Sequence, residues 1–124
     1  MKNRVLSVGQ CLPDAIAIER FLSGHFDVDV IAADDEHETR RQLADEQFHL
    51  VLINRKLDVD YSDGIEIIRR LKADPATAAV PMMLVTNFPE HDRAAVEVGA
   101  IPGFGKRDLA NPTTAERLRP YLEP

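Results

Sequence analysis

The sequence predicts an α/β domain built around a doubly wound parallel sheet, with three layers, five strands in the order 2-1-3-4-5 and five helices. Three observations favour this class. The chain has 124 residues, the length of one domain, so we treat 1–124 as a single unit. Short β-branched runs alternate five times with helical stretches, which is typical of parallel sheets with right-handed crossovers. The run 50–53 is wholly apolar, as expected for a strand buried on both faces.

The first unit is a strand over residues 5–8, followed by Gly9, and a helix over 13–23. The apolar residues of this helix lie largely on one side, and Pro13 suits its first turn. Because glycine is common just past a helix C-terminus, we expect Gly24 to end the helix.

The second unit begins with an alternating segment in which Phe26, Val28 and Val30 are separated by aspartates. This pattern predicts a half-exposed strand over 26–32 at an edge of the sheet. An acidic helix follows from 34 to about 46, and the acids in its first turn suit the positive end of the helix dipole.

The third unit contains the buried strand at 50–53, an aspartate-rich loop over 56–63 and a helix over 64–73. The loop has some features of a calcium-binding loop. With Asp58 as its first ligand, however, the position that requires glycine is Asp63. We therefore expect a solvated acidic loop that ends in a helix cap.

The last two units are shorter. The strand expected at 101–104 is weak because it contains Pro102 and Gly103, which are tolerated only at the edge of a sheet. Asn111 suits the cap of the last helix, and the following proline suits its first turn. The expected elements are a strand at 81–86, a helix at 89–98, a strand at 101–104 and a helix from 112 to about 122.

Composition and charge exclude several function classes. The net charge is −6 and the pI is about 5.1, which argues against binding to nucleic acid or to an anionic membrane surface. Cys11 is the single cysteine, so no disulfide can form within the chain. No apolar run has the length of a membrane span or of a signal peptide. We therefore expect a cytoplasmic domain.

In a sheet of this order, ligands bind at the carboxyl edge, beside the first and third strands. The residues at that edge resemble those of the response-regulator receiver domains of two-component signalling, a CheY-like family with a flavodoxin-like fold. The resemblance covers essentially the whole chain. Five stretches carry it: RVLSVGQ (4–10), LVLINRKL (50–57), DGIEIIRRLKADP (63–75), VPMMLVT (80–86) and VGAIPGFGK (98–106).

The resemblance implies a phosphorylation pocket whose positions can be assigned one by one. The acidic pair that binds Mg²⁺ in the family corresponds to Gly9 and Gln10, and the phosphoacceptor aspartate corresponds to Asn54. The hydroxyl and the lysine that hold the phosphoryl oxygens correspond to Thr86 and Lys106.

The resemblance also implies a switch position and a partner surface. The aromatic residue that rotates when the family's site is filled corresponds to Gly103, with Phe104 one position later and so expected on the opposite face of the strand. The family's partner surface consists of the fourth helix, the fifth strand and the fifth helix. On this chain the surface includes Arg93, Phe104 and Arg117.

All three acids that the family's chemistry requires are replaced. The amide of Asn54 cannot form a stable acyl phosphate, and Mg²⁺ prefers anionic oxygen ligands, which Gly9 and Gln10 lack. We therefore expect no enzymatic activity, no cofactor and weak or absent Mg²⁺ binding. We expect Asp58 or Asp63 to be the counter-charge of Lys106 in place of the missing acids.

The leading hypothesis is a receiver-like, non-enzymatic module that signals through contact with a histidine kinase, an output domain or a second copy. One alternative is a small-ligand or anion sensor that uses the emptied pocket around Gly9, Asn54, Thr86 and Lys106. The other is a receiver phosphorylated at a displaced acceptor such as Asp58. That residue lies four positions beyond the end of its strand and lacks a metal-binding pair.

Overall fold

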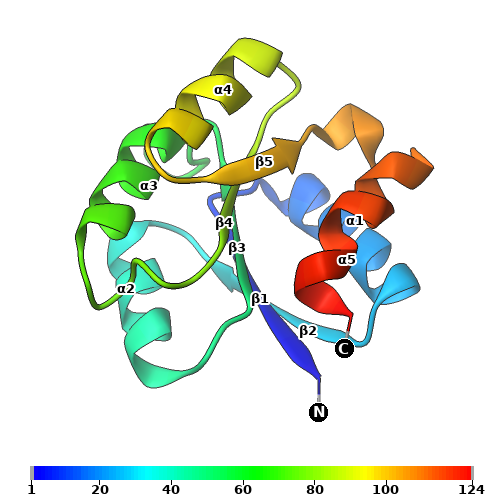
Figure 1. Ribbon diagram of the computed structural model, residues 1–124, viewed down its shortest axis with the longest axis horizontal. Coiled ribbons are helices and arrows are strands. Elements are labelled where there is room, and N and C mark those ends of the chain that lie inside the picture. The colour runs from blue at the N-terminus through cyan, green and yellow to red at the C-terminus, as the bar shows by residue number, and fades with distance from the viewer. Residues whose placement is uncertain (1, 124) are drawn as a thin grey trace.

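The computed structural model describes residues 2–123 and has the predicted architecture, with five parallel strands in the order β2-β1-β3-β4-β5 (Figure 1). The strands are β1 (Asn3–Val8), β2 (Val28–Ala33), β3 (Leu50–Asn54), β4 (Met82–Val85) and β5 (Ile101–Phe104). The helices are α1 (Leu12–His25), α2 (Glu36–Asp45), α3 (Gly64–Ala73), α4 (Pro89–Glu97), the short 3₁₀ helix η1 (Lys106–Asp108) and α5 (Pro112–Leu122).

Helices cover both faces of the sheet, so the core is divided in two. In Figure 1, α1 and α5 lie on one side of the strands, and α2, α3 and α4 lie on the other. Successive residues of β3 point to opposite faces: Leu50 and Leu52 pack in the core with α1 and α5, whereas Val51 and Ile53 pack in the other core. All four are fully buried, which confirms the prediction of a central strand.

The predicted end of the first helix is wrong. Helix α1 continues through Gly24 to His25, and the φ angle of Gly24 is not positive. The helix ends at Phe26, which is extended and buried and whose N–H donates to the carbonyl of Leu22 at 2.8 Å. Burial of this aromatic residue therefore ends the helix, and β2 begins two residues later, at Val28.

Three helices begin with the side-chain caps that their sequences favour. Asp35 accepts a hydrogen bond from the N–H of Glu38, so α2 begins after Asp35 rather than at Asp34. Asp63 accepts from the N–H of Ile65, which confirms that the acidic loop ends in a helix cap. Asn111 caps α5 in the same way.

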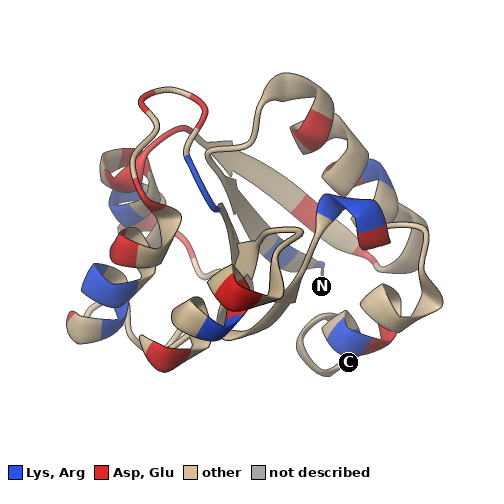
Figure 2. Ribbon diagram, turned by 90° about the horizontal axis from the view of Figure 1, so that it is seen from above, with Lys and Arg blue, Asp and Glu red and all other residues tan. Residues whose placement is uncertain are grey.

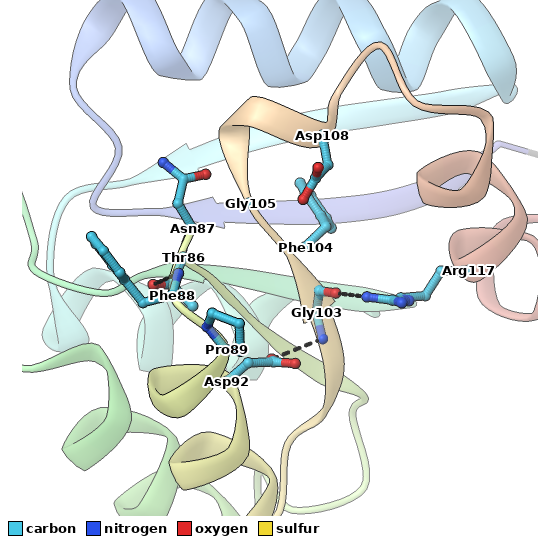
Figure 3. A pocket seen from close by; sticks show the side chains of 10 residues that line it. All are labelled: Thr86, Asn87, Phe88, Pro89, Asp92, Gly103, Phe104, Gly105, Asp108 and Arg117. Atoms are coloured by element: carbon cyan, nitrogen blue, oxygen red, sulfur yellow. Dashed lines mark hydrogen bonds between the residues drawn. The ribbon is translucent and has the colours of Figure 1, made fainter.

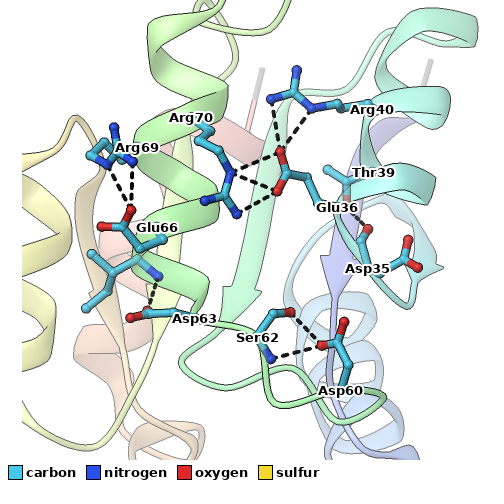
Figure 4. A network of polar contacts seen from close by, with 11 residues as sticks. Asp35, Glu36, Thr39, Arg40, Asp60, Ser62, Asp63, Glu66, Arg69 and Arg70 are labelled. Carbon is cyan, nitrogen blue, oxygen red and sulfur yellow. Dashed lines mark hydrogen bonds and ion pairs between the residues drawn. The ribbon is translucent and has the colours of Figure 1, made fainter.

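An ion-pair network joins α2 to α3 (Figure 4). Glu36 accepts hydrogen bonds from Arg40 on its own helix and from Arg70 on α3. Arg40 also contacts Asp74, at 2.8 Å. Burial raises the pKa of Glu36, but the hydrogen bonds and charges of Arg70 and Arg40 outweigh this effect and lower it overall. The network ties the two helices together on one face of the sheet.

Charges of both signs are spread over the helices (Figure 2), and every α-helix carries at least one acid and one base. Within residues 2–123, no helix combines the length and the apolar character needed to cross a membrane.

Candidate functional site

Three of the predicted pocket residues come together at the carboxyl edge of the sheet. Asn54 ends β3, Thr86 follows β4, and Lys106 begins η1 after β5. All three line one hollow of about 180 Å³. This convergence follows from the parallel sheet, in which neighbouring strands end at the same edge. Gly9 and Gln10, which follow β1, do not line this hollow.

The end of β1 is closed by Leu57, a side chain from the loop after β3. Gly9 has a φ of +73°, a conformation that residues with a Cβ rarely adopt. A Cβ at this position would collide with Cγ of Leu57 and lie 3.0 Å from its Cα. Leu57 is fully buried in the core. An apolar side chain thus fills the space into which any side chain at position 9 would have to extend.

The loop that carries Leu57 is held at both ends. The N–H of Asp58 donates to the carbonyl of Gly9 at 2.9 Å, which fixes the loop to β1. Lys56 and Asp63 form an antiparallel bridge that closes the loop on itself. These contacts seat Leu57 against the end of β1.

The side chain of Asn54 is directed at the backbone. Its Nδ2 donates to the carbonyl of Lys56 at 2.7 Å and to that of Gly9 at 3.4 Å. Both partners only accept hydrogen bonds, so the amide nitrogen rather than the oxygen must face them. A carboxylate in this orientation would face two carbonyl oxygens without a proton to share. Asn54 therefore joins β3, its own loop and the end of β1.

Lys106 forms its ion pair with Asp14 on α1, so the prediction that Asp58 or Asp63 neutralises it is wrong. The Nζ of Lys106 lies 2.6 Å from Oδ2 of Asp14. The same oxygen accepts a hydrogen bond from Sγ of Cys11 at 3.1 Å. The hydrogen bond from Lys106 is the main reason that the pKa of Asp14 lies below its usual 3.8; burial opposes this shift and Cys11 adds to it.

A second hollow, of about 230 Å³, lies beside β5 (Figure 3). The N–H of Gly103 donates to Asp92 of α4 at 3.0 Å, and Arg117 of α5 donates to the carbonyl of Gly103. A Cβ at Gly103 would collide with the carbonyl oxygen of Leu84 and lie 3.2 Å from its carbonyl carbon. The position that corresponds to the switch aromatic is thus held between two helices and too close to β4 for a side chain.

The three residues proposed for the partner surface lie in different environments. Arg93 on α4 and Arg117 on α5 are exposed. Phe104 is 5% exposed and packs in the core with α1 and α5, so it offers little surface to a partner. Phe88, which the sequence analysis did not select, is 51% exposed at the start of α4.

Sequence reasoning also missed four residues that shape the carboxyl edge. Asp14 pairs with Lys106, and Leu57 packs against Gly9. Arg55 pairs with Asp63 at 3.3 Å, and His91 of α4 lines the first hollow together with Arg55. The signal for Asp14 was an acid in the first turn of the helix that follows β1. Nothing in the sequence pattern pointed to Leu57 or His91.

No protein-family model matches the sequence, and no curated protein matches it. Solved structures match over nearly the whole chain. A candidate response regulator from Chloroflexus aurantiacus J-10-fl has a TM-score of 0.77 at 19% identity, with 100% of both chains covered. The chemotaxis response regulator CheY4 of Vibrio cholerae has a TM-score of 0.69 at 19% identity, covering 95% of this chain and 93% of that one. A response regulator receiver protein from Pseudomonas putida has a TM-score of 0.70 at 20% identity, covering 90% and 97%.

These likenesses agree with the strand order and with the alternation of strands and helices along the chain. At 19–20% sequence identity, these structural similarities are evidence for the fold alone. The chain therefore has the fold of the response-regulator receivers.

Proposed function

We propose that this domain is a receiver-type module of two-component signalling that acts through protein contact, without phosphorylation of Asn54. The observation that carries the proposal is the amide of Asn54, which corresponds to the family's phosphoacceptor and donates a hydrogen bond to the carbonyl of Lys56. An amide is neutral and its nitrogen lone pair is delocalised, so it does not attack a phosphodonor to give a stable acyl phosphate. Phosphoryl transfer is therefore not the input of this domain.

The residues at the edge do not fit the Mg²⁺ ion that receivers of this fold use. Mg²⁺ is usually bound through one or two carboxylates. Gly9, Gln10 and Asn54 supply none, and Leu57 fills the space beside Gly9. In residues 2–123, no group of three or more His, Cys, Asp and Glu side chains is arranged to hold a metal ion. We propose a domain without enzymatic activity.

A ligand shifts the equilibrium between two conformations only if it binds one of them more tightly than the other. A domain that is not phosphorylated therefore rests in one conformation, unless another ligand supplies that difference in affinity. Three contacts support a single resting conformation. They are the hydrogen bonds of Asn54, the ion pair between Lys106 and Asp14, and the two bonds that hold Gly103. We propose that the partner binds this resting conformation.

The proposed partner is a protein: a histidine kinase, an output domain or a second copy of the chain. We propose that it contacts the surface made by α4, β5 and α5. The exposed side chains of Arg93 and Arg117 and the exposed ring of Phe88 support this choice. A displaced acceptor at Asp58 is less well supported, because this residue lies four positions beyond the end of β3, and Gly9 and Gln10 supply no pair of carboxylates for a metal ion.

The test is a binding assay with labelled domain against candidate histidine kinases and output proteins, with sedimentation of the domain alone as the assay for a dimer. We expect the same Kd with and without acetyl phosphate and Mg²⁺. Arg93→Glu should weaken the complex about tenfold or more, since it reverses the charge of an exposed side chain on the proposed contact surface. Asn54→Ala and the control Arg69→Glu on α3 should leave it unchanged. An affinity that changes with the phosphodonor contradicts the proposal.

A further inference from the structure

The hollow beside β5 is lined by three charged side chains from three different elements (Figure 3). Asp92 lies on α4, Asp108 on η1 and Arg117 on α5. Within residues 2–123, none of the three takes part in an ion pair. Two acids and one base therefore line the same hollow without a charged partner.

Gly103 holds two of these charges in place. Its N–H donates to Oδ1 of Asp92 at 3.0 Å, and Nη1 of Arg117 donates to its carbonyl. Because β5 is an edge strand, these contacts satisfy backbone groups that such a strand can leave unpaired. Each contact uses one atom of the charged group. The carboxylate and the guanidinium are thus fixed at separate positions on the wall of the hollow.

The remaining polar atoms of these groups are accessible. Within residues 2–123, Oδ2 of Asp92 makes no hydrogen bond and is not among the side-chain atoms that are buried without a partner. Asp108 and Arg117 are exposed residues. Only one terminal nitrogen of the Arg117 guanidinium is engaged, so its other donors are available. A ligand in the hollow can therefore reach carboxylate oxygens on one side and guanidinium donors on the other.

The same hollow also has an apolar wall. Phe88 and Pro89, at the start of α4, are exposed and line it together with Phe104 of β5. Its volume of about 230 Å³ is below the roughly 300–1,000 Å³ of sites for drug-sized ligands. The hollow therefore suits a molecule of the size of an amino acid, with an apolar part and charges of both signs.

We propose that this hollow binds a free α-amino acid with an apolar side chain. The ammonium group of the ligand contacts Asp92 and Asp108, its carboxylate contacts Arg117, and its side chain packs on Phe88 and Pro89. An α-amino acid carries both charges at neutral pH, so it offers an opposite charge to each side of the hollow. A simple amine or a simple carboxylate offers only one. The inference goes beyond the proposed function, because contact with a protein partner does not require a small ligand.

The experiment is a titration of the full chain with L-leucine at constant pH and ionic strength, followed by ¹H–¹⁵N NMR that includes the arginine Nε–H signals. We expect saturable shifts of the Gly103 amide and of the Arg117 Nε–H, reversed by dialysis. Two matched compounds each lack one charge: 3-methylbutylamine has no carboxylate, and 4-methylpentanoate has no ammonium group. Both should bind at least about fivefold more weakly than leucine, because each leaves one side of the hollow without a partner.

Variants identify the site. Asp92→Asn removes the charge but keeps an oxygen that can accept from the N–H of Gly103, and Arg117→Gln removes the guanidinium. Each should raise the Kd for leucine about fivefold. The matched controls Asp45→Asn on α2 and Arg119→Gln on α5 alter exposed side chains outside the hollow and should leave the Kd unchanged. If Arg117→Gln fails to fold, because Gly103 loses a hydrogen bond, Asp92→Asn alone decides.

Three results overturn the proposal. The first is a set of leucine-dependent shifts that do not saturate, or no shifts at all. The second is an affinity for either matched compound equal to that for leucine, because the hollow would then not recognise both charges of an amino acid. The third is an unchanged Kd in Asp92→Asn. All arms use the domain without a partner, so their outcome does not depend on the proposed signalling contact.

Discussion

Replacing Gly9 by alanine should destabilise the domain strongly. Gly9 has a φ of +73°, and a residue with a Cβ pays about 1–2 kcal/mol in that left-handed conformation. The new methyl group would also collide with Leu57, and overpacking of a core costs about 1–3 kcal/mol. Together these effects lower the free energy of unfolding by about 2–5 kcal/mol. Gly24→Ala is the control, because a Cβ at Gly24 meets nothing within 4 Å; it should be neutral or stabilise α1 by up to about 1 kcal/mol.

The assay is urea unfolding followed by circular dichroism, with the same change repeated in a Leu57→Ala background. Leu57→Ala alone should cost about 2–5 kcal/mol because it opens a cavity. In that background the collision with Cγ is gone, while Cα and Cβ of residue 57 still lie 3.0 Å from the new methyl group, so Gly9→Ala should cost less than in the wild type but at least the conformational share of about 1–2 kcal/mol. A loss below about 0.5 kcal/mol, within the range of ordinary surface substitutions, would refute the reasoning. An equal loss in both backgrounds would show that Leu57 does not fill this space.

Three further substitutions test the remaining contacts at the edge. Asn54→Asp should lower the free energy of unfolding by about 1–3 kcal/mol more than Asn54→Ala does, because its carboxylate faces two carbonyl oxygens; urea unfolding measures the difference. Asp14→Asn should cost about 0.2–1 kcal/mol near neutral pH, since its pair with Lys106 is partly exposed. The folded pKa of Asp14 is lowered, so this stabilisation is present above its usual 3.8 and is lost as the pH falls through the folded value; the unfolding curves of variant and wild type should therefore converge in acid. Gly103→Tyr should lower the melting temperature rather than restore a switch, because any Cβ collides with the carbonyl of Leu84; an unchanged melting temperature would contradict this.

Much of the fold could be predicted from the sequence, because the local patterns agree with one another. The wholly apolar run of β3 marked the centre of the sheet, and the alternation around Val28 marked an edge. The caps at Asp63 and Asn111 confirmed two helix starts. The prediction that Gly24 ends the helix was wrong because this glycine does not adopt a positive φ angle. Burial of Phe26 decides where α1 ends, and that is a tertiary effect which a local pattern does not contain.

The site was less predictable, because it depends on contacts between distant segments. Strand order alone brought Asn54, Thr86 and Lys106 to one hollow. The partner of Lys106 came from α1, which lies close only in the folded chain. Leu57 packs against Gly9 because of the path of its loop, and the aspartate-rich composition of that loop indicated only exposure to solvent. To predict the ion-pair partner of a lysine at the carboxyl edge of a sheet, acids on the neighbouring helices have to be considered as well as those in the nearest loop.

The proposed function requires that phosphoryl transfer is not the input of this domain. The most direct measurement is intact-mass analysis of the wild-type chain after incubation with acetyl phosphate and Mg²⁺, with NMR spectra recorded before and after addition of beryllofluoride. We expect no added phosphoryl group and no beryllofluoride-dependent shift of the Asn54 amide signals. Stoichiometric phosphate on the wild-type chain that hydroxylamine removes would contradict it.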